Sequence, residues 1–349
     1  MGLSRIKGVK LASVCCAVPS SSREITEYVD QFGAGAVKKI SISTGISALR
    51  VAADDICTSD LCYAAACSLM EQSGIAADSI DTLIFVTQTP DYVLPATSCV
   101  LQGRLGLSKS CAAFDINLGC SGYVYGLWMA AGLVASGQSK NVLLLVGDTI
   151  SKIVSEEDRS VAMLFGDAGS ASLVTVGSDT DEMSFNLGTD GTGWESIVVR
   201  DGGFRNRTSE ASLVRTDVDG GRRSPMELAM RGSEVFEFTQ SQVPESIEQL
   251  MTYASSSVED IDHFVPHQAN KFMLSHLSGK LGFAREKLVI GIGRNGNTSS
   301  ASIPLAIVTE LQEKERLGKV LLSGFGVGLS WGSLLMRCDD LKILPLVEI

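Results

Sequence analysis

The stretch Ala113-Phe114-Asp115-Ile116-Asn117-Leu118-Gly119-Cys120-Ser121-Gly122-Tyr123 joins two apolar segments through a cysteine that is flanked by glycines. Its first residues form the end of a predicted strand. The run from Tyr123 to Ala135 is apolar on nearly every face, which predicts a buried helix. Cys120 is therefore expected at a helix N-terminus, where unpaired N–H groups and the helix dipole favour thiolate over thiol. Because a free cysteine is usually a small core residue, its reactivity depends on partners elsewhere in the chain.

Composition indicates a soluble globular protein of one large domain or two ordinary ones. The chain has 349 residues, of which 45% are apolar, and no apolar run is long and pure enough to span a membrane. Its nine cysteines are scattered without C-x-x-C pairs and its three histidines lack ligand spacing. We therefore expect a reducing cytoplasm, no disulfide framework and no metal site. The net charge of −11 disfavours nucleic acid and anionic membranes as partners.

Predicted strands and helices alternate along the chain. We expect strands at 9–18, 80–87, 142–146 and 171–176, and helices at 22–33, 58–73 and 96–105. Three segments then recur in the same order: 262–268 echoes 81–87, 319–326 echoes 141–148, and 331–337 echoes 169–175. This repetition predicts an α/β protein with two halves of like topology, residues 1–178 and 179–349.

The segment from Gly188 to Gly232 is irregular and contains seven arginines but no lysine. It is interpreted either as a solvated loop or as a surface that meets phosphates or an acidic partner.

Two further corners carry polar side chains that suit catalysis. His267 directly follows an apolar strand in Val265-Pro266-His267-Gln268, and sites gather at strand ends in α/β proteins. Asn297 lies in a glycine turn that opens a predicted helix, where it could equally be an N-cap. Because the second half repeats the first, we expect Cys120, His267 and Asn297 to form one site.

Two glycine motifs offer a rival interpretation as a nucleotide site. Gly291-Ile292-Gly293-Arg294-Asn295-Gly296 matches G-x-G-x-x-G, but no first βαβ unit surrounds it. The glycine-rich run from Gly324 to Gly328 lacks the lysine of a phosphate-binding loop.

Taken together, the motifs resemble those of the β-ketoacyl-acyl-carrier-protein synthase III family of the thiolase superfamily. The matching segments span almost the whole chain: Thr44-Gly45-Ile46, Asn117 to Gly122, Leu164 to Gly169, Val265 to Asn270, Gly296 to Pro304, and Gly324 to Gly332. The resemblance implies a five-layered αβαβα fold, a homodimer and a Cys–His–Asn site.

The resemblance also implies a mechanism. Cys120 takes an acyl group from acyl-CoA or acyl-carrier protein, and the backbone N–H groups of Cys120 and Val327 form the oxyanion hole. Malonyl-carrier protein then loses CO₂, and His267 and Asn297 donate hydrogen bonds to the enolate. The product is a β-ketoacyl thioester of fatty acid or specialised acyl biosynthesis. Neither a metal nor a redox cofactor is needed, since coenzyme A and phosphopantetheine thioesters enter as substrates.

Residues around the site are assigned by the same resemblance. Four positions are expected in the coenzyme A or pantetheine channel: Arg159, Arg231, Ser233 and Asn270. Leu94 is expected to reach the partner subunit's acyl pocket. Lys271 and Lys280 are expected to meet the acidic carrier protein, with Arg285 and Lys287 as further candidates.

The chain departs from the family pattern at the entrance. Lys39 and Ser43 stand where a Trp and an Arg help to hold the adenine in well-known members, and Phe272 replaces an Arg. Val327 replaces a glycine of the oxyanion loop but keeps its N–H. These departures suggest a specialised member rather than the initiator of fatty acid synthesis.

Other functions remain open from the sequence. One is an acyltransferase of the same fold that moves the acyl group to an oxygen or nitrogen nucleophile. Another is a quinolone-type or head-to-head condensing enzyme. A non-catalytic binder of acyl thioesters or of nucleotides is the alternative from a different class.

Overall fold

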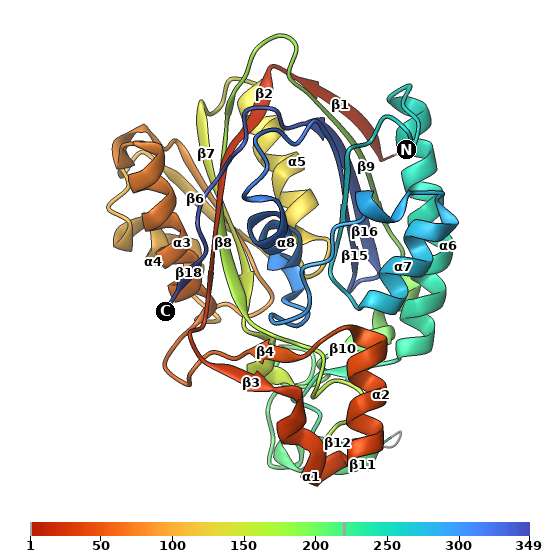
Figure 1. Cartoon of the computed structure of the whole chain (residues 1–349). Coiled ribbons are helices and arrows are strands. Elements are labelled where there is room, and N and C mark those ends of the chain that lie inside the picture. Colours follow the sequence, from red (N-terminus) through yellow and green to blue (C-terminus); the bar gives the residue numbers. More distant parts are fainter. Residues whose placement is uncertain (1, 219–220) are drawn as a thin grey trace.

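The computed structural model describes residues 2–218 and 221–349, in which two β-sheets and three helical layers alternate as αβαβα (Figure 1). Helices lie between the two sheets and on both outer faces. The inner layer holds α5 (Gly122–Ala135) and α8 (Ser302–Leu311), one outer layer α3 (Thr58–Ser73) and α4 (Thr97–Arg104), and the other α6 (Gly232–Tyr253) and α7 (Lys271–Lys280). The expected fold class is confirmed.

Each sheet is mixed. The first has the order β17 (Lys342–Ile343), β2 (Val9–Val18), β8 (Ala168–Val176), β7 (Asn141–Asp148), β5 (Thr82–Val86) and β6 (Ala112–Ile116), with β18 (Val347–Glu348) also paired to β2. The second has the order β1 (Leu3–Lys7), β9 (Glu182–Thr189), β16 (Ser330–Arg337), β15 (Lys319–Gly326) and β14 (His263–Pro266).

The two sheets repeat one topology. The series β2-β8-β7-β5 in the first corresponds to β9-β16-β15-β14 in the second, and each series ends in a parallel pair after antiparallel ones. Three of these four pairs, β8 with β16, β7 with β15 and β5 with β14, are the segments whose sequences echo each other. The two ends of the chain cross between the sheets. Strand β1, near the N-terminus, belongs to the second sheet, and strands β17 and β18, near the C-terminus, belong to the first.

The inner layer explains why the segment after Cys120 is apolar all round. Helix α5 lies between both sheets, so Tyr123, Val124 and Leu127 are fully buried (Figure 1). Burying such a side chain contributes roughly 1.5–3 kcal/mol. Gly126 allows the helix to approach the first sheet, since a Cβ there would lie 2.8 Å from Cδ1 of Leu144.

A small cap of short elements lies beneath the two sheets (Figure 1). It contains β3 (Ser22–Glu24), β4 (Ala48–Arg50), α1 (Val29–Phe32), α2 (Ala34–Thr44), β10 (Ile197–Val198), β11 (Thr216–Val218), β12 (Gly221–Arg223) and β13 (Ala229–Met230). Short 3-10 turns complete the chain at Ile25–Tyr28, Ala77–Ser79, Ile150–Ile153, Gly191–Ser196, Ala211–Leu213, Arg285–Lys287 and Ser299–Ala301.

The predicted helix at 22–33 is confirmed only in part. Residues 22–24 pair with β4 as a strand, whereas Ile25–Tyr28 form a 3-10 turn and Val29–Phe32 form α1, which ends where Gly33 turns to φ 81°. Helix α2 then follows, which the sequence pattern did not indicate. The other predicted strands and helices agree with the structure to within a few residues.

The arginines of the segment from Gly188 to Gly232 are largely paired with acids. Arg215 contacts Glu157 and Glu227, and Arg223 contacts Asp158 at 2.7 Å. Further ion pairs join Arg200 to Glu195, Arg222 to Glu157, and Arg231 to both Glu195 and Glu234. These pairs favour a structural role for the segment over a surface prepared for phosphates.

All nine cysteines are free thiols. Within 2–218 and 221–349, no helix is long and apolar enough to cross a membrane.

Candidate active site

Cys120 lies in the tight turn between β6 and α5, and 6% of the residue is exposed. Helix α5 begins at Gly122, so the predicted position at a helix N-terminus is confirmed. A Cβ on Gly122 would lie 2.7 Å from Cγ1 of Val86, which explains why the turn needs glycine. The end of β15 passes over the sulfur, where a Cβ on Gly326 would lie 2.9 Å from the Cys120 Sγ. The backbone N–H groups of Cys120 and Val327 both interact with this sulfur.

The Cys120 side chain is a thiol at neutral pH. Burial raises its pKa to about 11, with a further increase from the charge of Asp148. The Ser299 hydroxyl and the N–H groups of Val327 and Cys120 oppose this shift. Desolvation therefore outweighs the helix terminus, which by itself favours thiolate.

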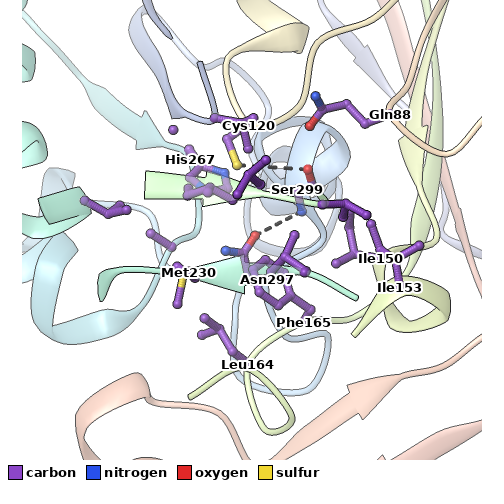
Figure 2. A pocket seen from close by; sticks show the side chains of 18 of the residues that line it. Gln88, Cys120, Ile150, Ile153, Leu164, Phe165, Met230, His267, Asn297 and Ser299 are labelled. Carbon is purple, nitrogen blue, oxygen red and sulfur yellow. Dashed lines mark hydrogen bonds between the residues drawn. The ribbon is translucent and has the colours of Figure 1, made fainter. Parts of the chain in front are cut away.

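His267 follows β14 and points into the same cavity as Cys120 (Figure 2). Burial lowers its pKa to about 3, although the Ser299 backbone opposes the shift, so the ring is neutral. Nδ1 lies 2.6 Å from Oγ of Ser302, which also accepts from the Gln268 N–H at 3.3 Å. We assign the Ser302 proton to the bond with Nδ1, which places the ring proton on Nε2. Phe325 holds the ring edge-on, with centroids 5.6 Å apart.

Asn297 is held by the turn around Gly296, whose φ of 71° favours glycine. Its backbone pairs with the chain at Leu164 and Gly166, at 2.8 and 3.1 Å. Its side-chain oxygen accepts from the Ser299 N–H at 3.0 Å, which orients the amide so that the NH₂ group remains as a donor (Figure 2). Asn297 is not the N-cap of α8, because that helix begins only at Ser302.

A cavity of about 530 Å³ connects these residues with the surface. Its polar end contains Cys120, His267, Asn297 and Ser299, with Gln88 and Asn117 nearby. Much of the remaining wall is apolar: Ile150, Ile153, Leu164, Phe165, Ile197, Val198, Val199, Leu228, Met230, Val235 and Met273. Such a cavity suits a flexible acyl chain that reaches a polar reaction centre.

Of the four residues predicted in the coenzyme A or pantetheine channel, two line the cavity or the groove beside it and two do not. Asn270 lines the cavity and caps α7 by accepting from the Met273 N–H at 2.8 Å. Arg159 lines a neighbouring groove with Asn270 and Ser43. Arg231 instead turns outward to its acidic partners, and Ser233 is exposed on the first turn of α6. Neither of these two lines the cavity.

The predicted surface residues lie outside the cavity. The loop side chain of Leu94 is 79% exposed. Lys271 lines a surface groove with Arg285, whereas the Lys280 ammonium donates to the Gln240 carbonyl at 2.5 Å. Val327 lines the cavity itself, as expected from its place after β15.

Sequence reasoning missed three polar residues around the site. Ser299 and Ser302 belong to the serine-rich run after Asn297, and Asp148 ends strand β7. The signal that could have found Asp148 is its place at a strand end, which is where sites gather.

The glycine motif at Gly291 to Gly296 does not form a dinucleotide site. It is a turn rather than the start of a helix, and the Gly291 N–H donates to Oε1 of Gln268 at 2.9 Å. An N–H group that is already paired in this way is not available to a pyrophosphate.

Comparisons with known proteins agree with the geometry. Two family models match, described as 3-oxoacyl-[acyl-carrier-protein] synthase III over residues 114–191 and its C-terminal part over 251–338. The chain is 36% identical over 304 residues to the β-ketoacyl-[acyl-carrier-protein] synthase III of Xanthomonas campestris, covering 84% of this chain and 87% of that protein. It is 33% identical over 335 residues to that of Clostridium perfringens, covering 95% and 100%.

A solved structure gives the same answer. The crystal structure of a 3-oxoacyl-(acyl-carrier protein) synthase from Burkholderia xenovorans matches with a TM-score of 0.93 and 41% identity, and the match covers 99% of each chain. The chain therefore belongs to the β-ketoacyl-[acyl-carrier-protein] synthase III family of condensing acyltransferases.

Proposed function

We propose that this chain catalyses the decarboxylative condensation of an acyl thioester with malonyl-carrier protein, giving a β-ketoacyl-carrier protein and CO₂. The observation that carries the proposal is the convergence of Cys120, His267 and Asn297 on one apolar-walled cavity. The thiol supplies a nucleophile, and the two other side chains supply neutral hydrogen-bond donors.

The first half-reaction acylates Cys120. Its sulfur attacks the carbonyl carbon of the acyl thioester, and the bond to the leaving thiol breaks. The N–H groups of Cys120 and Val327, which already interact with the sulfur, stabilise the tetrahedral oxyanion. Gly326 leaves these N–H groups close to the sulfur because no side chain intervenes there.

The second half-reaction forms the carbon–carbon bond. The malonyl carboxylate leaves as CO₂, and its bonding electrons become an enolate of the thioester. Nε2–H of His267 and the Asn297 NH₂ donate to the enolate oxygen. A neutral ring suits this role, since a donor rather than a base is needed. The enolate carbon then attacks the acyl carbon and frees Cys120. Neutral donors are sufficient for this chemistry, so we propose that no metal or redox cofactor takes part.

The second substrate class is a carrier protein, and the first is either coenzyme A or a carrier thioester. Ser43 and Arg159 line the groove beside the cavity, together with Asn270. With a serine and Lys39 in place of the larger adenine-binding side chains, we propose a specialised member that prefers carrier-bound primers. Competition between acetyl-CoA and acyl-carrier thioesters tests this preference, and efficient priming by acetyl-CoA would contradict it.

The carrier protein is proposed to dock beside the cavity mouth. Lys271 and Arg285 line a surface groove, and an acidic carrier protein would complement them despite the net charge of −11. Leu94 is proposed to meet the second subunit of a homodimer, because it lies in an exposed apolar loop. A cytoplasmic location fits the nine free thiols.

The direct test is CO₂ release from carboxyl-labelled malonyl-carrier protein in the presence of an acyl primer. We expect labelled CO₂ in equal amount to β-ketoacyl product. Transfer of the acyl group to an oxygen or nitrogen nucleophile without CO₂ release would instead identify the alternative acyltransferase.

A further inference from the structure

Asp148 is a buried carboxylate for which the condensation mechanism has no use. It lies at the end of β7 and is fully buried. Oδ1 accepts from the Gln88 N–H at 2.7 Å and from Oγ1 of Thr87 at 3.1 Å. Oδ2 accepts from the Ser300 N–H at 3.1 Å and from its hydroxyl at 2.6 Å. These partners are neutral, and holding a charge among neutral groups in a protein interior is costly.

Ser299 lies between this carboxylate and the nucleophile. Its Oγ is 4.0 Å from the Cys120 Sγ (Figure 2). The same hydroxyl also interacts with Asp148. The backbone of Ser299 has a positive φ of 49°. Among the other described non-glycine residues, only Ser255 also has a positive φ. Such strain persists where neighbouring contacts impose it. Here the contacts are those of Asn297 before it and Ser300 after it.

Acylation requires a proton acceptor, since Cys120 rests as a thiol. His267 is a weak proton acceptor, because burial lowers its pKa to about 3. The Ser299 hydroxyl is a polar side-chain group that contacts the sulfur.

We propose that Asp148 accepts the proton of Cys120 during acylation, acting through the hydroxyl group of Ser299. The proposal rests on Cys120 being the acylated nucleophile. As the bond from Sγ to the acyl carbon forms, the thiol proton passes to Oγ of Ser299 and the Ser299 proton passes to Asp148. The bond to the leaving sulfur breaks, and the proton returns by the same route to that thiolate, so Asp148 ends as it began.

The surroundings of the two groups agree with this transfer. The titratable groups facing Asp148 are Cys120 and, from α3, Cys62, whose pKa is raised mainly by burial. His267 lies on the other side of Cys120 in the same cavity. Burial raises the pKa of Asp148, while hydrogen bonds from Ser300, Gln88 and Ser299 limit the rise. A raised pKa makes the carboxylate a better acceptor.

Two measurements on Asp148→Asn separate proton transfer from a structural role. The first is single-turnover acylation by an acyl thioester that acylates the wild type, followed by intact-protein mass spectrometry from pH 6 to 10. The second is alkylation by iodoacetamide, followed on the Cys120 peptide because Cys67 and Cys99 are exposed and also react. We expect acylation at pH 7 to fall about 10²-fold or more and to recover as pH rises. Alkylation should move to lower pH, because removing the negative charge favours thiolate.

Two further variants make the outcome decisive. Ser299→Ala interrupts the route but keeps the charge, so acylation should fall without the alkylation shift. Asp167→Asn is the matched control, because Asp167 is equally buried and accepts from the N–H groups of Ala52 and Ser151 away from the sulfur. In this control, we do not expect acylation to fall while alkylation moves to lower pH.

Unchanged acylation in Asp148→Asn or Ser299→Ala would overturn the proposal, as would acylation and alkylation that fall together without recovery at high pH. If the wild type forms no acyl adduct on Cys120 with any primer, the proposed nucleophile fails instead, which is a different result.

Discussion

At the scale of single residues, the site combines one nucleophile with two neutral hydrogen-bond donors. Cys120 is set by glycines that admit no side chain, whereas His267 and Asn297 are each oriented by a serine. The serines fix which atoms remain free for substrate. The chemistry therefore depends on hydrogen bonds behind the reacting groups as much as on the groups themselves.

Asn297→Ala should lower the rate of condensation about 10²–10³-fold while leaving acylation of Cys120 near its wild-type rate, because the amide donates only to the enolate. Single-turnover assays of each half-reaction measure the two effects separately. His276→Ala is a control, because this histidine is exposed on α7. Equal losses in both half-reactions would contradict the assigned role.

His267 also predicts how stability depends on pH. Its folded pKa is about 3 against an ordinary value of 6.5, so between these values the unfolded chain binds more protons than the folded one. This residue therefore destabilises the fold as pH falls from 6.5 towards 3, by at most about 5 kcal/mol. Chemical denaturation of wild type and His267→Asn at pH 7 and pH 5 measures the difference. A wild type that loses no more stability than the variant would contradict the buried neutral ring.

At the scale of elements, tight turns position the chemistry, and the turn around Gly296 is the clearest example. A Cβ there would lie 2.6 Å from Cδ2 of Leu49 in addition to the strain of φ 71°. Gly33 has φ 81° but open space around it, which makes it a matched control.

Gly33→Ala should cost roughly 1–3 kcal/mol of unfolding free energy from backbone strain alone. Gly296→Ala should cost roughly a further 1–3 kcal/mol from the collision, and should also impair condensation by displacing Asn297. Denaturant titration and the condensation assay test both statements. Equal stability in the two variants would show that the turn adapts.

Strands and helices whose apolar residues recur at a regular spacing were predictable from the sequence, and the fold class could be predicted from their order. The echo of 141–148 in 319–326 marks β7 and β15 with their observed bounds. The cap was not predictable, because residues 22–44 change from strand to two helices within a few turns and bury few side chains. The sequence singled out Cys120 and His267 because each follows a strand, and Asn297 because it lies in a glycine turn. The contacts of Ser299 with Cys120 and of Ser300 with Asp148 join the two halves, and no local pattern records such contacts.

At the scale of the whole molecule, three consecutive apolar side chains are exposed between β5 and α4. Tyr92, Val93 and Leu94 are 57%, 76% and 79% exposed in one loop. Exposed apolar patches of this kind mark interaction sites, which agrees with the proposed homodimer.

Leu94→Asp should shift the protein from dimer to monomer and reduce acylation, since burying a charge at an apolar contact is unfavourable. Analytical ultracentrifugation measures the first effect. Ile42→Asp serves as control, because Ile42 is 70% exposed on α2. A variant that remains as dimeric as the wild type would place the dimer contact elsewhere.

The proposed condensation depends on transfer of the acyl group to Cys120. This transfer can be measured by intact-protein mass spectrometry of wild type and Cys120→Ala after incubation with a panel of acyl-CoA and acyl-carrier thioesters. We expect an acyl adduct on the wild type, located on the Cys120 peptide, and none on the variant. An adduct that survives the Cys120→Ala substitution would contradict it.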